Sequence, residues 1–262
     1  MDSAHAEAAS QILVRHWRDG TVLASLPAAL RPATRAEGYA IQARLETISA
    51  RPLQGWKIAA TSTAGQAHIG VDGPLAGRLL AEMIHEDGAT LALASNRMRV
   101  AEPEFAFRMG SDLAPRARPY TTGEVLAAVG ALHVAIEIPD SRFEDFVTAG
   151  AAQLIADNAC GHRFVLGPEA PALWRDLDLA AHRVVGRVGD RIARDGRGAN
   201  VLGDPRIALT WLANELSRHG VTLAAGQIVT TGTCMVPLEI APGDDVTADY
   251  GALGRVGVQF RS

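Results

Sequence analysis

Three glutamates in this sequence have the residue type and the spacing of metal ligands. Glu102 and Glu104 lie two residues apart, and Glu137 interrupts the otherwise apolar run of residues 133–138. In a strand, residues two apart point to the same face of the sheet, so Glu102 and Glu104 should project together. A carboxylate buried in such a strand needs a cation nearby or becomes protonated. Three convergent carboxylates with no Lys or Arg beside them suit a hard divalent metal ion with oxygen ligands.

Each of these signals also has a simpler interpretation. A Glu-x-Glu pair can form the solvated face of a strand, and a single glutamate in a strand often pairs with arginine. The alternation also places Phe105, Phe107 and Met109 on the face opposite the glutamate pair. The sequence does not show that the two strands are neighbours, so both interpretations stay open at this point.

Lys57 is a candidate for binding or moving charge in a substrate. It lies in the apolar segment of residues 55–59, where an inward-facing lysine is costly unless it contacts an anion. One interpretation is a lysine with a packed stem and an ammonium in solvent. The other is a cation that binds a substrate carboxylate or moves a proton.

A dense polar cluster occupies residues 157–162, between Asp157 and His162. Because Asp, Asn and Gly are common turn formers, the cluster can be a plain turn between a helix and a strand. Cys160 and His162 lie two apart with no orienting group nearby, so we do not expect Cys160 to be a nucleophile.

The segment Thr231, Gly232 and Thr233 follows a strand. Its hydroxyl and backbone N–H groups could bind an anionic oxygen of a substrate. A simple turn at the end of the strand explains the same residues equally well.

Composition excludes several classes of function. The 262 residues carry 25 basic and 29 acidic side chains and no long basic run, which argues against nucleic acid or an anionic membrane as a partner. The first residues lack the basic and apolar regions of a signal peptide, and no apolar stretch is long enough to span a bilayer. Two cysteines give neither a disulfide framework nor zinc spacing, so we expect a cytoplasmic protein. Nucleotide-binding and serine-hydrolase motifs are absent from the sequence.

The sequence predicts two N-terminal helices followed by short strands, which pair mostly as hairpins, with further helices between them. Caps at Thr34, Thr121 and Asp204 predict helix starts, and Gly189-Asp190 predicts a hairpin turn. This pattern favours a mixed or antiparallel sheet system with peripheral helices. The expected helices are 4–18, 34–51, 121–132 and 204–220. The expected strands are 56–60, 98–109, 133–138, 164–166, 184–188, 191–194, 228–230, 246–250 and 255–260.

These segments together resemble the 2-keto-4-pentenoate hydratase family within the fumarylacetoacetate hydrolase superfamily. The resemblance runs from about Gly55 to the C-terminus and is weaker in the N-terminal helices. Its motifs are Gly55-Trp56-Lys57-Ile58, Thr61-Ser62, Gly70-Val71-Asp72, Glu102-Pro103-Glu104, Glu137-Ile138-Pro139-Asp140-Ser141-Arg142, Ala156-Asp157-Asn158-Ala159, Val201-Leu202-Gly203, Trp211-Leu212-Ala213-Asn214, Ala225-Gly226-Gln227-Ile228, Thr231-Gly232-Thr233 and Pro242-Gly243-Asp244.

The resemblance implies an α+β fold, a mixed β-sheet roll of the fumarylacetoacetate hydrolase type with flanking helices. We expect a helical N-terminal segment (1–54) and a catalytic mixed-sheet domain (55–262). The resemblance also implies Mg²⁺ or Mn²⁺ held by Glu102, Glu104 and Glu137, an active-site role for Lys57, and assembly as a homo-oligomer.

The expected reaction is that of a metal-dependent hydro-lyase. Water would add to a short unsaturated 2-oxo acid, such as 2-hydroxypenta-2,4-dienoate, to give a 4-hydroxy-2-oxo acid. Lys57 and Asp157 are the expected catalytic residues, and Lys57, His162 and residues 231–233 would bind the substrate. A bound divalent ion would act as a Lewis acid.

Three alternatives stay open. The same ligand set suits a decarboxylase of the 4-oxalocrotonate type or an acylpyruvate C–C hydrolase, although no convincing His/Glu pair supports the hydrolase. A non-catalytic small-acid-binding or scaffold subunit is the fourth interpretation, because Cys160-Gly161-His162 departs from the Ser-Ser-Gly or Ser-Cys-Gly of relatives. The ring of His162 would fill part of the pocket, and its titration near pH ~6.5 would make activity depend on pH. The segment after Pro74 also lacks the acidic residue that some relatives carry.

Overall fold

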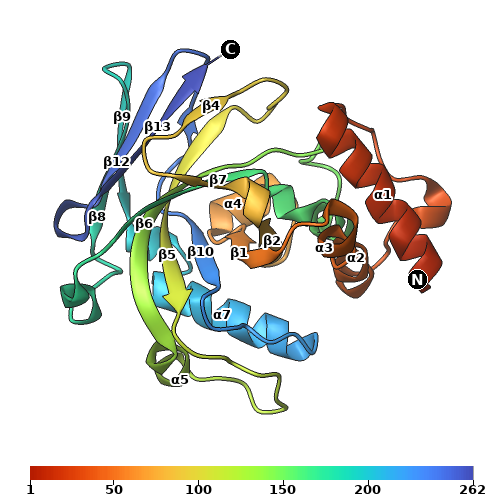
Figure 1. Ribbon diagram of the computed structural model, residues 1–262, viewed down its shortest axis with the longest axis horizontal. Helices are drawn as coiled ribbons and strands as arrows, with labels where there is room; N and C mark the ends of the chain where they lie inside the picture. Colours follow the sequence, from red (N-terminus) through yellow and green to blue (C-terminus); the bar gives the residue numbers. More distant parts are fainter. Residues whose placement is uncertain (262) are drawn as a thin grey trace.

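The computed structural model describes residues 1–261 and shows two β-sheets with helices outside them (Figure 1). The larger sheet has the strand order β2-β1-β10-β5-β6-β7-β3, with the short β11 pairing to β5. Its strands are β1 (Leu53–Ala59), β2 (Leu75–Leu80), β3 (Ile84–Glu86), β5 (Val100–Met109), β6 (Val129–Ile138), β7 (Arg163–Glu169), β10 (Ile228–Thr233) and β11 (Leu238–Glu239). β1 is parallel to β10 and β3 to β7, while the other pairs are antiparallel, so the sheet is mixed.

The smaller sheet has five strands in the order β4-β13-β12-β8-β9. They are β4 (Thr90–Ala92), β8 (Arg183–Val188), β9 (Ile192–Arg197), β12 (Asp245–Asp249) and β13 (Arg255–Arg261). The predicted hairpin turn at Gly189-Asp190 joins β8 to β9, and the predicted final hairpin pairs β12 with β13. β13 packs against β6 and β7 of the larger sheet.

Seven α-helices flank the sheets in the described part of the chain. They are α1 (Ser3–Asp19), α2 (Arg35–Gln42), α3 (Leu45–Ser49), α4 (Thr63–His68), α5 (Thr122–Ala127), α6 (Ala151–Ala156) and α7 (Pro205–Arg218). Within residues 1–261, no helix combines the length and the apolar content that crossing a bilayer requires.

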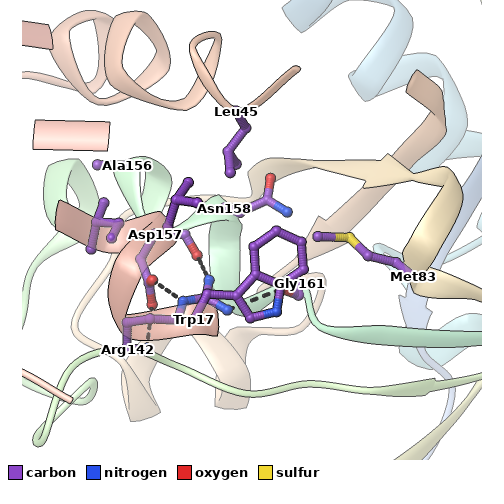
Figure 2. A pocket seen from close by; sticks show the side chains of 10 residues that line it. Trp17, Leu45, Met83, Arg142, Ala156, Asp157, Asn158 and Gly161 are labelled. Atoms are coloured by element: carbon purple, nitrogen blue, oxygen red, sulfur yellow. Dashed lines mark hydrogen bonds and ion pairs between the residues drawn. The ribbon is translucent and has the colours of Figure 1, made fainter. Parts of the chain in front are cut away.

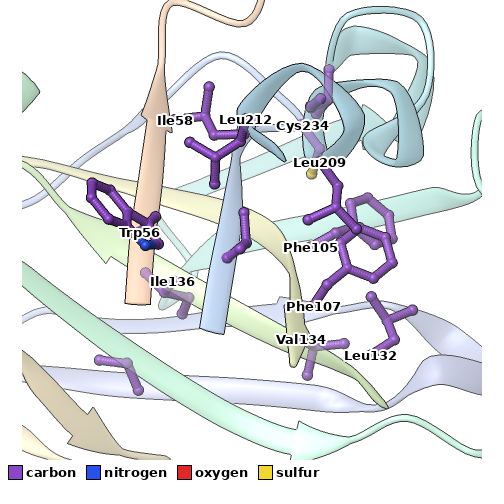
Figure 3. Packing of buried hydrophobic residues seen from close by; sticks show 14 of the residues in the cluster. Trp56, Ile58, Phe105, Phe107, Leu132, Val134, Ile136, Leu209, Leu212 and Cys234 are labelled. Carbon is purple, nitrogen blue, oxygen red and sulfur yellow. The ribbon is translucent and has the colours of Figure 1, made fainter. Parts of the chain in front are cut away.

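The main hydrophobic core lies on one face of the larger sheet. Phe105 and Phe107 of β5 pack there with Trp56 of β1, and Leu209 and Leu212 of α7 cover them (Figure 3). Met109 is buried in the same core, so the predicted apolar face of β5 is confirmed. The alternation of β5 therefore turns Glu102 and Glu104 to the other face of the sheet.

The predicted fold class is confirmed, but two helix boundaries were wrong. The segment after Thr34 forms two helices, because the Arg44 N–H bonds to the Ile41 carbonyl at 3.1 Å and tightens the turn between α2 and α3. The helix capped by Thr121 ends at Ala127 rather than at residue 132. Residues 129–132 extend β6 instead, because they pair with the end of β5.

Before β1, the N-terminal residues contain α1, α2, α3 and a short 3₁₀ helix (Ala28–Leu30), joined by irregular chain. Leu13 and Ile41 share a hydrophobic cluster with Phe143 and Ala156, so α1 and α2 are packed on the segments around β6 and α6. Whether residues 1–54 form a unit separate from residues 55–262 stays a prediction. β2, α4 and α6 carried no local pattern that the sequence analysis used.

Candidate metal centre

The three glutamates meet on the face of the larger sheet that is turned away from the main core. β5 and β6 are antiparallel neighbours, and Glu102 lies directly opposite Glu137 in their register. Glu104 lies one step along the same face, and one carboxylate oxygen from each glutamate lies within 4.8 Å of the other two. The sequence left open whether the strands that carry Glu102 and Glu137 are neighbours, and the structure shows that they are.

The donor set fits a divalent cation. Like charges directly opposite each other destabilise a strand pair, so Glu102 and Glu137 are an unfavourable pair without a cation. Glu104 Oε1 and both carboxylate oxygens of Glu137 are buried and have no hydrogen-bond partner. Buried polar atoms are normally satisfied, and three free oxygens converging from two adjacent strands are suited to a hard metal ion.

Strand β10 lies on the side of β5 opposite β6, and it orients Glu104 through hydrogen bonds. Thr230 Oγ1 donates to Glu104 Oε2, and the Gly232 N–H donates to the same oxygen at 2.7 Å. The register between β10 and β5 shifts after Thr230, and Gly232 has φ +95°, so this bulge aims its N–H at the carboxylate. Oε2 is held by the protein while Oε1 stays free, which fixes the direction in which Glu104 can bind a metal ion.

Burial shifts the protonation of all three glutamates. Burial, and next the repulsion from Glu137, raises the pKa of Glu102 to about 7, against the opposing charge of Lys57. Burial also raises the pKa of Glu104 well above its usual range, with further repulsion from Glu137 and Glu102. Burial raises the pKa of Glu137 as well, although Lys57 opposes the shift. Without a bound metal ion, the three carboxylates therefore tend to keep protons despite the nearby Lys57.

Lys57 lies beside the glutamates and is buried. Its Nζ is 3.1 Å from Glu137 Oε1, an ion pair without hydrogen-bond geometry, and it donates to the Ala159 carbonyl at 2.9 Å. Burial opposes its charge, but the carboxylates of Glu137, Glu102 and Glu104 outweigh burial and raise its pKa. The interpretation of Lys57 with its ammonium in solvent is therefore wrong.

Lys57 is also the only lysine of the chain, since the other 24 of the 25 basic residues are arginines. The sequence analysis did not use this signal. An arginine cannot give up its proton in a protein, whereas a lysine is a compact cation that can. The chain thus has its one lysine side chain next to the three carboxylates.

The segment of residues 231–233 has its polar groups engaged by the protein. Thr231 Oγ1 donates to the Phe105 carbonyl at 2.9 Å, and Thr233 Oγ1 donates to the Met235 carbonyl at 2.9 Å. The Gly232 N–H is used by Glu104. In this structure the segment positions a glutamate, and its predicted contact with substrate stays a prediction.

Both carboxylate oxygens of Asp157 accept hydrogen bonds from neighbouring residues. Its carboxylate is buried and accepts hydrogen bonds from Ser141 Oγ at 2.7 Å, from the Arg142 N–H at 3.0 Å and from Arg142 Nε. Burial raises its pKa, while Arg142 and Ser141 oppose the shift. These hydrogen bonds connect Asp157 to the segment after β6, and its predicted catalytic role stays a prediction.

His162 lies at a small polar pocket that contains none of the three glutamates. The pocket is also lined by His16, Trp17, Asp140 and Arg142. Burial, followed by the nearby positive charges of Arg142 and Arg163, lowers the pKa of His162 to about 3. The expectation that His162 titrates near pH ~6.5 is therefore corrected, because this ring is neutral well below that pH.

Cys160 is a buried thiol. Burial, and next the negative charge of Asp157, raises its pKa to about 12, so it carries no thiolate at neutral pH. His162 has no contact with Cys160 among the hydrogen bonds of the described residues; its Nδ1 lies 3.4 Å from Asn96 Nδ2. The geometry agrees with the prediction that Cys160 is not a nucleophile.

Tyr250 was missed by the sequence analysis. It follows β12 of the smaller sheet, and its hydroxyl reaches the carbonyls of Glu104 at 2.8 Å and Ala135 at 3.1 Å. It therefore touches the backbone of β5 at a predicted metal ligand and the backbone of β6 two residues before Glu137. No local pattern signals this role, since it depends on how the two sheets pack.

The comparisons with known proteins agree with this geometry. Residues 80–261 match the family described as fumarylacetoacetate (FAA) hydrolase C-terminal. The 2-keto-4-pentenoate hydratase 1 of Dechloromonas aromatica (strain RCB) is 35% identical over 257 residues, covering 97% of this chain and 96% of that protein. The 4-oxalocrotonate decarboxylase of Pseudomonas putida is 32% identical over 231 residues, covering 87% of this chain and 86% of that protein.

A solved structure covers nearly the whole chain. The 4-oxalocrotonate decarboxylase from Pseudomonas putida G7, complexed with magnesium and adipate, superimposes with a TM-score of 0.89 at 26% identity, covering 99% of this chain and 98% of that one. The chain belongs to the 2-keto-4-pentenoate hydratase family of the fumarylacetoacetate hydrolase superfamily.

Proposed function

We propose that this protein is a hydro-lyase that adds water to a short unsaturated 2-oxo acid and releases a 4-hydroxy-2-oxo acid. The substrate would resemble 2-hydroxypenta-2,4-dienoate, the class that the names of its 35%-identical relatives indicate. The observation that carries the proposal is the group of three carboxylates beside the chain's only lysine, two of which are buried with unpaired oxygens.

Glu102, Glu104 and Glu137 would hold a divalent ion, Mg²⁺ or Mn²⁺. When bound, the ion would supply Lewis-acid stabilisation of negative charge on the substrate's oxygens. The magnesium in the decarboxylase complex supports the choice of a hard cation for this fold. Glu102 is the most exposed of the three, which suits a site that opens to substrate on its side.

Lys57 would place its ammonium next to the substrate's carboxylate and move a proton to or from the carbon skeleton. Its position beside Glu137 gives it a partner that keeps it charged until the proton moves. Asp157 is proposed as a positioning residue rather than an acid or a base, because both of its oxygens accept hydrogen bonds from the protein.

Decarboxylation of a 2-oxo-enedioate is the second candidate, favoured by the close structural match to a decarboxylase bound to adipate. Charge argues for the hydratase. Two buried arginines near the site are already paired, Arg142 with Asp157 and Arg78 with Glu46. A second substrate carboxylate would thus meet three glutamates, and Lys57, the cation beside them, is already paired with Glu137.

An NMR assay of products separates the two reactions. The enzyme is incubated with Mg²⁺ or Mn²⁺ and with freshly generated 2-hydroxypenta-2,4-dienoate or 2-hydroxymuconate. We expect the 4-hydroxy-2-oxo acid from the first substrate and no loss of CO₂ from the second. Lys57→Met should keep the fold and metal binding but lower turnover. Decarboxylation of 2-hydroxymuconate without hydration of the dienoate would overturn the proposal.

We also propose that the protein forms a homo-oligomer. Light scattering on the purified chain tests this, and a mass equal to one chain at assay concentration would contradict it.

A further inference from the structure

Three consecutive residues beside Lys57 have a left-handed backbone. Asn158, Ala159 and Cys160 have φ values of +56°, +50° and +61°. None of them is glycine, and non-glycine residues rarely take this conformation one after another. Such strained backbone persists only where the surrounding structure fixes it, and it concentrates at functional sites.

The side-chain amide of Asn158 fastens this turn to β2. Its Oδ1 accepts from the Arg78 N–H at 2.6 Å, and its Nδ2 donates to the Arg78 carbonyl at 2.8 Å. The amide thus takes the place of a strand neighbour along the edge of β2, which within residues 1–261 otherwise pairs only with β1. From the other side of the turn, Arg142 donates to the carbonyls of Asp157 and Gly161.

The N-terminal helices back the turn. A small pocket separates them from it, lined by Trp17 of α1, Leu45 of α3, Asp157 and Asn158 (Figure 2). The turn is therefore enclosed between β2 and the helices, which explains how three strained residues can be kept in place.

The turn aims one carbonyl at Lys57. Ala159 O is 2.9 Å from Lys57 Nζ, and it is the one hydrogen-bond acceptor of this ammonium in the described chain. β2 allows the close approach through Gly77, where an added Cβ would lie 2.4 Å from Asn158 O and 2.9 Å from Lys57 Cδ. Gly77, Asn158 and Ala159 together define where the ammonium sits relative to Glu137.

We propose that Asn158 is a positioning residue for Lys57. Its amide holds the strained turn against β2, and the turn in consequence holds the Ala159 carbonyl at the Lys57 ammonium. The role of Lys57 in turnover rests on the proposed function above, but the positioning of Lys57 does not, so the two can fail separately.

The rate of chemical labelling at Lys57 reports how well its ammonium is held in place, and it can be measured without metal or substrate. Because Lys57 is the only lysine, the chain offers two amino groups, Lys57 Nζ and the N-terminal amine. The metal-free protein is treated with an acylating reagent, and the label at Lys57 is followed by peptide mass spectrometry. The N-terminal amine serves as the internal reference.

Asn158→Ala is compared with Asn214→Ala. Asn214 makes the same two-bond clamp at a distant position, accepting from the Tyr120 N–H at 2.7 Å and donating to the Tyr120 carbonyl at 3.0 Å. We expect labelling of Lys57 to quicken about tenfold in Asn158→Ala and to stay near the wild-type rate in Asn214→Ala. If Asn158→Ala does not fold, Asn158→Gly removes the amide while favouring the left-handed φ.

A double-mutant cycle tests whether Asn158 acts on turnover through Lys57. Asn158→Ala should lower kcat more than it raises KM, and it should lower kcat no further in the Lys57→Met background. Equal labelling of Lys57 in the Asn158 and Asn214 variants would overturn the positioning role. Faster labelling in a protein that lacks hydratase activity would keep that role and refute only the proposed reaction.

Discussion

Removing one carboxylate of the site should stabilise the metal-free protein while weakening its binding of metal. The variant is Glu102→Gln, which keeps the shape of the side chain and removes its charge. Burial and repulsion from Glu137 raise the pKa of Glu102 from 4.5 to about 7 in the folded protein. A shift of about 2.5 pKa units at ~1.4 kcal/mol each gives roughly 3 kcal/mol of destabilisation from the ionised Glu102.

The pH range of this effect follows from the direction of the shift. The folded protein holds the Glu102 proton more tightly than the unfolded chain does. The destabilisation is therefore absent below about pH 4.5, grows as the pH rises toward 7 and is constant above that. Glu102→Gln should unfold with the wild-type free energy near pH 4.5 and should be more stable than wild type by roughly 3 kcal/mol at pH 8.

Urea denaturation in the presence of a chelator, at both pH values, measures this difference. Repeating the series with Mg²⁺ should stabilise the wild type by mass action and the variant much less. Glu86→Gln, at an exposed glutamate of β3, is the matched control and should change neither quantity. The reasoning is refuted if Glu102→Gln is no more stable than wild type at pH 8 without metal, or if Mg²⁺ stabilises both equally.

Three further variants test other parts of the site. Tyr250→Phe removes the hydroxyl that contacts the carbonyls of Glu104 and Ala135, so calorimetry should show weaker Mg²⁺ binding along with a stability loss of about 1–3 kcal/mol; unchanged Mg²⁺ affinity would leave the hydroxyl a purely structural role. Gly77→Ala places a Cβ 2.4 Å from the Asn158 carbonyl. Rate assays should therefore show slower turnover, and thermal unfolding followed by circular dichroism should show a stability loss of about 1–3 kcal/mol. The control variant Gly123→Ala has open space around its Cβ and should be tolerated. Cys160→Ala should keep most of the activity, because the buried thiol has its pKa raised to about 12, and complete loss of turnover with metal still bound would contradict this.

Much of the site was predictable because it depends on local patterns. The alternation of β5 predicted that Glu102 and Glu104 share a face, and the apolar run of β6 marked Glu137 as out of place. The caps at Thr121 and Asp204 predicted helix starts, and both side chains do cap their helices. Thr34 also caps its helix by accepting from the Glu37 N–H at 3.2 Å, while the Glu37 carboxylate bonds to the N-terminal amine and the Ala33 N–H.

The functions assigned to single polar residues were less predictable, because they depend on neighbours far away in the chain. Asp157 looked like a candidate acid or base, but Arg142 and Ser141 engage its carboxylate. His162 looked like a group that titrates near neutral pH, but burial beside arginines lowers its pKa to about 3. Desolvation and nearby charge decide these properties, and neither is visible in a local pattern.

The sequence by itself determined which residue types are available: three glutamates at strand spacing, one lysine, and the family motifs around them. Tertiary structure decided that they form a site. Antiparallel pairing of β5 with β6 sets Glu102 opposite Glu137, and parallel pairing of β1 with β10 brings Lys57 to the same face. The strained turn of residues 158–160, which is bonded to β2, then holds the Lys57 ammonium through the Ala159 carbonyl. Register between strands is set by long-range packing of the whole sheet, and therefore only the folded chain could fix these positions.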